Sequence, residues 1–258
     1  LSKKHGYTIS EILADSNEVA FRVEILSNND SAHAVNTALS KAIVGISNAY
    51  LKISPDIVLL LGDRYEILGA AIAAMTHNIP IAHIHGGELT EGVIDEAIRH
   101  SVSKMASIHF VATEEYKRRV IQLGEHPKNV FNVGGMSLDS INNIDYFELN
   151  EIEELFGCKF KKSNLIVTHH PLTLDLEEGK LEVKAMLEAI KSFPEINFFF
   201  TMPNADTGND LIRKKITKFV NENKNTYLFE SLGQRLFLSA LRHVDGIIGN
   251  SSSGLLEW

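Results

Sequence analysis

The sequence alternates short apolar runs with segments of helical periodicity, and this alternation constrains the fold more than any other feature. Each run has the length of a β-strand and is rich in Ile, Val, Leu or Phe. Between the runs, apolar residues recur three or four positions apart, as on a helix that buries one face. Repeated strand–helix units are typical of a parallel sheet covered by its crossover helices. The sequence therefore predicts an α/β protein.

In the first half of the chain, four strands are predicted, with a helix after each of the first three. The strands are predicted at 56–62, 80–85, 108–113 and 129–133, and the helices at 65–76, 93–106 and 115–123. The first strand shows no polar alternation, which predicts that it is buried on both faces.

The second half repeats the pattern after a polar stretch without strand signals. Strands are predicted at 165–168, 198–201, 227–229 and 246–249, separated by helices that include the apolar stripe of Val183, Met186, Leu187 and Ile190 and the segments 210–221 and 236–241. We therefore predict two Rossmann-like, doubly wound domains that face each other across a cleft. The predicted ranges are 1–145 for the first domain, 146–162 for a linker and 163–258 for a second, nucleotide-binding domain. Both ends are predicted to be truncated, because the chain begins at Leu1 and stops where a helix should start.

Composition excludes several classes of protein. The net charge of −8 argues against a broad nucleic-acid surface, which needs clustered Lys and Arg. No apolar run approaches the ~20 residues needed to span a bilayer, and no signal peptide is found at the start. The only cysteine, Cys158, excludes an internal disulfide and fits a reducing compartment. We therefore predict a cytoplasmic protein without nucleic-acid or membrane partners.

Polar clusters follow the predicted strands, at the edge where parallel sheets bind their ligands. Each cluster alone is a weak signal, but five at equivalent positions indicate a functional edge. They are 62–64, 83–88, 169–171, 203–206 and 249–254.

Two acid–base pairs in these clusters have both a structural and a functional interpretation. Asp63 and Arg64 are either a helix-start cap or a carboxylate and guanidinium in the cleft. Asp95 and Arg99 are four apart on one helix face, so they are either an ion pair or part of the site. Buried carboxylates can transfer protons at neutral pH, which makes both pairs candidates for acid–base catalysis.

A histidine pair raises the question of a metal. His83 and His85 are two apart on a predicted strand and should point to the same side. With Glu88, Asp95 or His170 they would make a metal site. The alternative is that they are hydrogen-bonding residues at a strand end. Because no H-E-x-x-H motif and no cysteine cluster accompany them, we predict no metal.

The segment 249–254, which we call the serine turn, has the composition of an anion site. Ser251 and Ser252 supply hydroxyls where a new helix would present free amides, a combination that suits a phosphate or diphosphate. The alternative is an ordinary serine helix cap. Asn204 in the 203–206 cluster would by itself be only an Asx turn.

In chain order these clusters resemble the hydrolysing UDP-N-acetylglucosamine 2-epimerases of sialic acid and legionaminic acid synthesis. The resemblance spans nearly the whole chain and implies the two-domain fold of B-type glycosyltransferases. It is carried by the segments LGDRYEILGAAIAAM, IPIAHIHGGELTEGVIDEAIRHSVSKM, THHPLT, MPNADTG and GNSSSGLLE.

The resemblance implies roles for the residues of the first half. Asp63 and Asp95 match carboxylates implicated in catalysis, and Arg64 and Arg99 lie in the same motifs. Several relatives have Glu in the place of His85. The resemblance therefore implies that His85 replaces that catalytic Glu or that Glu88 takes part.

The resemblance also implies a nucleotide site in the second half. His170 matches a histidine near the diphosphate, and Asn204 matches an asparagine in the cleft. Ser251 and Ser252 match phosphate-binding serines, and Glu257 matches the acid that holds the ribose. The family's first strand and the segment after Trp258 have no counterpart in this sequence.

The implied reaction eliminates UDP from a UDP-sugar and then hydrates the resulting glycal, which inverts C2. It needs no cofactor, and neither glycine cluster fits the G-x-G-x-x-G dinucleotide motif. A homodimer is expected. The alternatives are a B-type glycosyltransferase, against which the GGE…DE…RH block argues, a metal-dependent hydrolase built on His83 and His85, and, last, a binding module.

Overall fold

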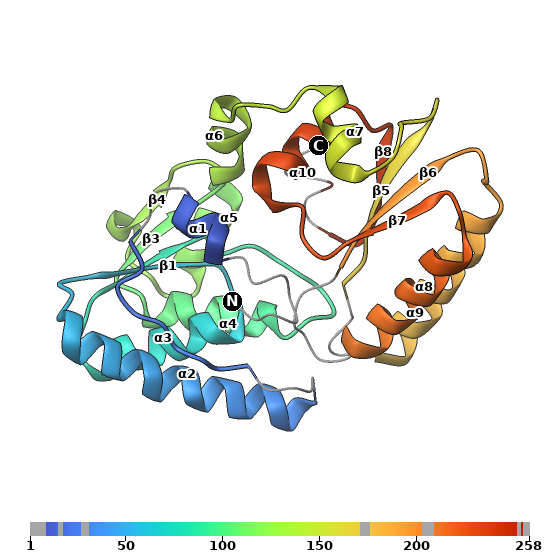
Figure 1. The fold of residues 1–258 in the computed structure, drawn as a ribbon. Coiled ribbons are helices and arrows are strands. Elements are labelled where there is room, and N and C mark those ends of the chain that lie inside the picture. The colour runs from blue at the N-terminus through green and yellow to red at the C-terminus, as the bar shows by residue number, and fades with distance from the viewer. Residues whose placement is uncertain are drawn as a thin grey trace. The chain divides into compact units, whose positions relative to one another are not determined.

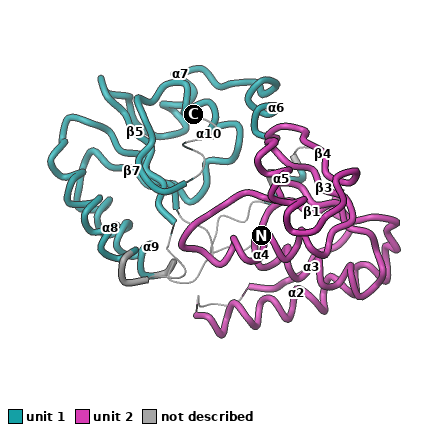
Figure 2. The backbone as a smooth tube through the Cα atoms, turned by 180° about the vertical axis from the view of Figure 1, so that it is seen from behind, with its two compact units in different colours: residues 1–17, 137–258 teal, residues 18–136 magenta. Residues whose placement is uncertain are grey.

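The computed structural model of the chain describes residues 9–14, 18–26, 31–170, 176–202, 209–251 and 254. Two compact units divide the chain, unit 2 covering residues 18–136 and unit 1 covering residues 1–17 and 137–258 (Figures 1 and 2). Each unit contains a four-stranded sheet, and the described strand pairs are parallel. This confirms the predicted α/β class. Among the described residues, none of the helices is both long and apolar enough to cross a membrane.

Unit 2 has its strands in chain order across the sheet. They are β1 (Val58–Leu61), β2 (Ile81–Ile84), β3 (Ile108–Val111) and β4 (Val130–Asn132). The helices are α2 (Ala32–Ile53), α3 (Tyr65–Thr76), α4 (Asp95–Met105) and α5 (Glu114–Gln122), and a 3-10 turn spans Pro127–Asn129. The connections between successive strands therefore all advance in one direction across the sheet. Right-handed crossovers of this kind place their helices on the same face of the sheet.

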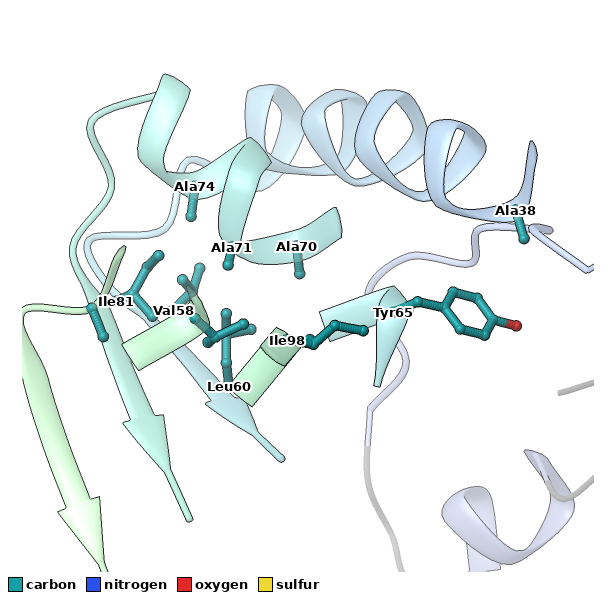
Figure 3. Packing of buried hydrophobic residues seen from close by; sticks show 11 residues of the cluster. Ala38, Val58, Leu60, Tyr65, Ala70, Ala71, Ala74, Ile81 and Ile98 are labelled. Carbon is teal, nitrogen blue, oxygen red and sulfur yellow. The ribbon is translucent and has the colours of Figure 1, made fainter. Parts of the chain in front are cut away.

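Small side chains on α3 allow this helix to approach the sheet closely. Ala70, Ala71 and Ala74 lie above Val58 and Ile81 in the core of unit 2 (Figure 3). These five residues are buried, and α2 packs against the other side of α3. The alanine-rich sequence of α3 therefore accounts for a helix that is covered on two sides.

The opposite face of β1 is open. Leu59 is 63% exposed and Leu61 is 51% exposed, whereas Val58 and Leu60 are buried. The prediction that this strand is buried on both faces is therefore wrong. β1 lies at the edge of the sheet, and its inward face alone belongs to the hydrophobic core.

Unit 1 has helices on both faces of its sheet, whose strand order is β7-β6-β5-β8. One core contains residues of α8 and α9, and a second core, on the other face, contains residues of α7 and α10. The strands are β5 (Asn164–Thr168), β6 (Asn197–Thr201), β7 (Thr226–Phe229) and β8 (Gly246–Gly249). The helices are α1 (Ile9–Ala14), α6 (Met136–Asn143), α7 (Leu149–Phe156), α8 (Leu176–Lys191), α9 (Asn209–Glu222) and α10 (Gly233–Leu241).

The predicted linker, residues 146–162, differs from the structure. It contains α7, whose Ile152 and Phe156 are buried in the second core of unit 1. The backbone of the helix start is held by a capping box between Glu148 and Glu151. The segment has many charged residues, but the apolar pair four positions apart makes α7 amphipathic and attaches it to the sheet. Along the chain, the boundary between the two units lies between residues 136 and 137 instead.

We expect Ile152→Ala to lower the free energy of unfolding by about 2–5 kcal/mol, because the side chain is fully buried. The matched control is Leu155→Ala on the same helix, where the side chain is 54% exposed and the change should stay within about 0.5 kcal/mol. Urea denaturation followed by circular dichroism measures both. Equal, small effects would mean that this segment is a linker after all.

Candidate active site

The predicted site residues of unit 2 gather at the carboxyl edge of its sheet. Asp63 follows β1 after one glycine, and His85 follows β2 directly. The ladder continues one residue past each strand, since Gly62 N donates to Ile84 O at 3.2 Å and His85 N donates to Phe110 O at 2.9 Å. Hydrogen bonds thus fix the backbone at the point where the polar side chains begin.

Arg99 connects the segments that meet at this edge. It lies on α4, and its side chain is only 3% exposed. Its guanidinium donates to the Asp63 carboxylate, to Glu88 O at 3.1 Å, to Thr90 Oγ1 at 2.9 Å and to Glu96 Oε2 at 3.3 Å. A buried guanidinium is stable only when its donors are paired, so these contacts hold the loop after β2 close to Asp63.

Asp63 is consequently a positioned carboxylate. Arg99 binds Oδ2, and within the described part of the chain no hydrogen bond to Oδ1 is found. The side chain is 26% exposed, so a ligand can reach it. It is not a helix cap, because Arg64 takes the N-cap position of α3 without a side-chain cap bond. Arg64 itself pairs with Glu66 at 2.9 Å.

Glu96 and Thr90 belong to the site but are absent from the sequence-based set. The sequence pairs Arg99 with Asp95, which lies half-buried in the first turn of α4. The structure pairs Arg99 with Asp63 and with Glu96, whose Oε2 also accepts from Thr90 N at 2.5 Å. Carboxylates three and four positions before an arginine are equally placed on a helix, so spacing could not choose between them.

His85 and Glu88 form a second pair in the same loop. His85 Nδ1 lies 2.5 Å from Glu88 Oε1, and the side chains are 20% and 23% exposed. His85 has a φ of 64°, a left-handed conformation that side chains rarely adopt and that tends to persist only where the surroundings impose it. A carboxylate on one ring nitrogen fixes the tautomer and leaves the other nitrogen for proton transfer. The pair therefore has the form of an acid–base dyad.

The two glycines between them allow this loop to pack against α5. Gly87 has a φ of 82°, and a Cβ at this position would lie 2.4 Å from Tyr116 O. Arg119 on α5 donates to Gly87 O. Only glycine fits this position, and the contact with α5 fixes the direction in which Glu88 leaves the turn.

His83 has a structural role that excludes it as a metal ligand. The ring is fully buried, with Nε2 2.9 Å from Gly62 O and Nδ1 3.1 Å from Ser103 Oγ. A carbonyl only accepts, so Nε2 donates and Nδ1 accepts from the Ser103 hydroxyl. Burial, partly offset by the hydrogen bond to Gly62, lowers the pKa of His83 to about 4.

The strand alternation does not reach His85, because β2 ends at Ile84 and His85 is left-handed. The prediction that His83 and His85 act from the same strand face is therefore wrong. Among the described residues, no three His, Cys, Asp or Glu side chains gather as a metal site would require.

In unit 1, the predicted binding residues that the structure describes lie at the ends of β5 and β8. His170 follows β5, and its backbone forms two hydrogen bonds with the side chain of Asn250, which follows β8. Ser251 comes next in the chain and is half-buried. The preceding His169 is buried with Nε2 3.3 Å from Glu182 Oε2, and burial lowers its pKa. The other predicted binding residues, Asn204, Ser252 and Glu257, lie outside the described residues.

A family model described as UDP-N-acetylglucosamine 2-epimerase matches residues 1–257. The chain belongs to this family. This confirms the resemblance found in the sequence motifs.

Individual relatives agree with the family. The chain is 37% identical over 258 residues to the "GDP/UDP-N,N'-diacetylbacillosamine 2-epimerase (hydrolyzing)" of Campylobacter jejuni, covering 100% of this chain and 67% of that protein. It is 39% identical over 254 residues to the "Polysialic acid biosynthesis protein P7" of Escherichia coli, covering 98% and 64%. The chain thus spans about two thirds of these relatives.

A solved structure shows the same fold. The crystal structure of UDP-GlcNAc 2-epimerase from Neisseria meningitidis, bound to UDP-GlcNAc, superposes with a TM-score of 0.75 at 21% identity. The match covers 96% of this chain and 68% of that chain. The parallel α/β architecture is therefore that of the epimerase structures.

The buried His83 predicts a loss of stability in mild acid. Its pKa is about 4 in the folded protein and 6.5 in the unfolded chain, so between these values only the unfolded chain binds the proton. The contribution of neutral His83 to the free energy of unfolding is therefore fully present above pH 6.5. It is lost as the pH falls toward 4, because protonation then favours the unfolded chain. This contribution to the free energy of unfolding is about 3 kcal/mol, at 1.36 kcal/mol for each pKa unit.

His83→Gln should therefore reduce the fall in unfolding free energy between pH 7.5 and pH 4.5, measured by urea denaturation. Part of the fall should remain, because burial also lowers the pKa values of His109 and His169. The control is His33→Gln, an exposed position on α2, which should keep the full fall. An unchanged fall in His83→Gln would contradict the assignment.

Proposed function

We propose that this protein is a hydrolysing nucleotide-sugar 2-epimerase. Its substrate would be UDP-N-acetylglucosamine or a 2,4-diacetamido-trideoxy relative, and its products UDP and the free C2-inverted sugar. The observation that carries the proposal is the Asp63 carboxylate, held by the buried Arg99 in one network with the loop of His85 and Glu88. Family membership supports the same reaction.

The reaction needs two proton transfers at C2, on opposite faces of the sugar. In the first step the C2–H and C1–O bonds break, a C1=C2 double bond forms, and UDP leaves. In the second step the hydroxyl of a water molecule adds to C1, its other proton passes to the solvent, and a proton reaches C2 from the other face. We assign the first transfer to Asp63, whose Oδ1 is not engaged by described groups. We assign the second to the His85–Glu88 pair, with Asp95 as a further carboxylate at this edge.

The leaving diphosphate needs donors that stabilise its charge. We assign this role to unit 1, where His170 and the serine turn follow neighbouring strands. The strand order reverses at this point, because β6 and β7 lie on one side of β5 and β8 lies on its other side. α/β sheets bind ligands at the carboxyl ends of strands at such a switch point. Arg64, Asn204 and Glu257 complete the proposed substrate contacts, and the scheme involves no cofactor.

The sugar and its use are supported by the relatives. One relative is named for N,N'-diacetylbacillosamine and another for polysialic acid biosynthesis. We therefore propose that the product serves the synthesis of sialic acid-like sugars in the cytoplasm. The homodimer stays a prediction.

The intact protein, incubated with UDP-N-acetylglucosamine or UDP-N,N'-diacetylbacillosamine in deuterated water, should release UDP and a free sugar with inverted C2. The C2 position should carry solvent deuterium, because the returned proton comes from a group that exchanges with water. Proton NMR follows both features. UDP release with an unchanged, protiated C2 would mean simple hydrolysis and reject the epimerase proposal.

Asp63→Asn and Asp95→Asn should each lower turnover by roughly 10²–10⁴-fold, the usual scale for losing acid–base catalysis. UDP affinity, measured by calorimetry, should change far less, because neither side chain is assigned to the nucleotide. The control is Asp56→Asn, an exposed aspartate before β1 at the opposite edge of the same sheet, which should keep normal turnover. Near-normal turnover in either test variant would remove that residue from the mechanism.

A further inference from the structure

The side chain of Asn250 extends the pairing of β5 and β8 past its last regular step. The strands pair as far as Thr168 and Gly249. Beyond them, Asn250 Oδ1 accepts from His170 N at 2.8 Å and Asn250 Nδ2 donates to His170 O at 2.9 Å. A carboxamide that binds both backbone groups of one residue imitates a peptide unit of a neighbouring strand. We call this pair of bonds the Asn250 clip.

The backbone of β8 leaves the sheet at the same point. Gly249 has a φ of 137°, and a Cβ there would lie 1.7 Å from Thr168 O. Only glycine permits this approach. After it, Gly254 N donates to Ser251 O at 3.3 Å. Among the described residues, the regular pairing of β5 and β8 ends at Gly249, and the side chain of Asn250 provides the next link to the segment after β5.

The clip joins two segments to which the proposed function gives the same ligand. His170 lies on one side of the clip, and Ser251 is the next residue on the other. Phosphate oxygens are bound by donors from several segments at once, so their affinity depends on the spacing between those segments. Both polar atoms of Asn250 are already engaged with His170.

We propose that Asn250 is a positioning residue that holds Ser251 and the backbone of His170 at the spacing that a diphosphate needs. The inference rests on the proposed function, because it takes both segments as diphosphate-binding. The inference gives Asn250 an effect on diphosphate binding that acts through His170 and Ser251. Because Asn250 is solvent-exposed, its two bonds contribute little to the stability of the fold.

Asn250→Ala should weaken UDP binding about tenfold, equal to ~1.4 kcal/mol, with little change in the melting temperature of the ligand-free protein. The ³¹P resonances of bound UDP should also move, because the donors around the phosphates are displaced. Calorimetry, thermal melting and ³¹P NMR measure the three effects. A purely stabilising role predicts a lower melting temperature with unchanged UDP affinity and unchanged resonances.

The matched control is Asn225→Ala. Asn225 also forms two side-chain bonds to the backbone, to Phe193 O at 3.1 Å and Ile196 O at 2.8 Å, but it precedes β7 at the opposite edge of the sheet. This variant should bind UDP as the wild type does. A loss of affinity equal to that of Asn250→Ala would overturn the inference.

Asn250→Asp is the second test variant, because it keeps the shape and the acceptor for His170 N while placing a carboxylate oxygen opposite His170 O. It should bind UDP at least as weakly as Asn250→Ala. Wild-type affinity in either Asn250 variant would overturn the role of the clip and leave the proposed function intact. A wild-type protein that fails to bind UDP would instead overturn the proposed function itself.

Discussion

The buried guanidinium of Arg99 is the interaction on which the candidate site depends. A charge that is 3% exposed must be paired, and its partners come from the turn after β1, the loop after β2 and the first turn of α4. Because one rigid group satisfies all of them, the three segments are held in a single arrangement. The same contacts fix Asp63 by one oxygen, while its side chain as a whole remains 26% exposed. The burial of this charge and the geometry of the candidate site are thus two consequences of one residue.

Both units solve the same problem at the carboxyl edge of a parallel sheet, where the ladder stops and backbone groups need new partners. In unit 2 the ladder runs one residue further, and His83 takes up the carbonyl of Gly62. In unit 1 the side chain of Asn250 binds the backbone N–H and C=O of His170 beyond the end of the ladder. Glycines stand where the backbone must approach its neighbour most closely, at Gly87 and Gly249.

Much of this protein was predictable from local sequence. The helix at 65–76 and the strand at 246–249 have the predicted bounds, and most other elements differ by a few residues at their ends. The motifs that follow the strands identified the family, and binding and catalytic residues are generally concentrated in loops that a rigid scaffold positions. They also selected Asp63, Arg99, His85 and Glu88, which the structure brings into one network.

Sequence by itself determined the alternation of elements, the edge of the sheet that carries polar groups and the family. Only the tertiary structure decided which groups meet. Strand order left Leu59 exposed, although its strand is uniformly apolar, and burial of Ile152 attached a charged segment to unit 1. Arg99 pairs with Asp63, 36 positions away, and Asn250 with His170, 80 positions away. Periodicity describes neighbours along one element, whereas pairing across elements depends on strand order and on which polar groups become buried together.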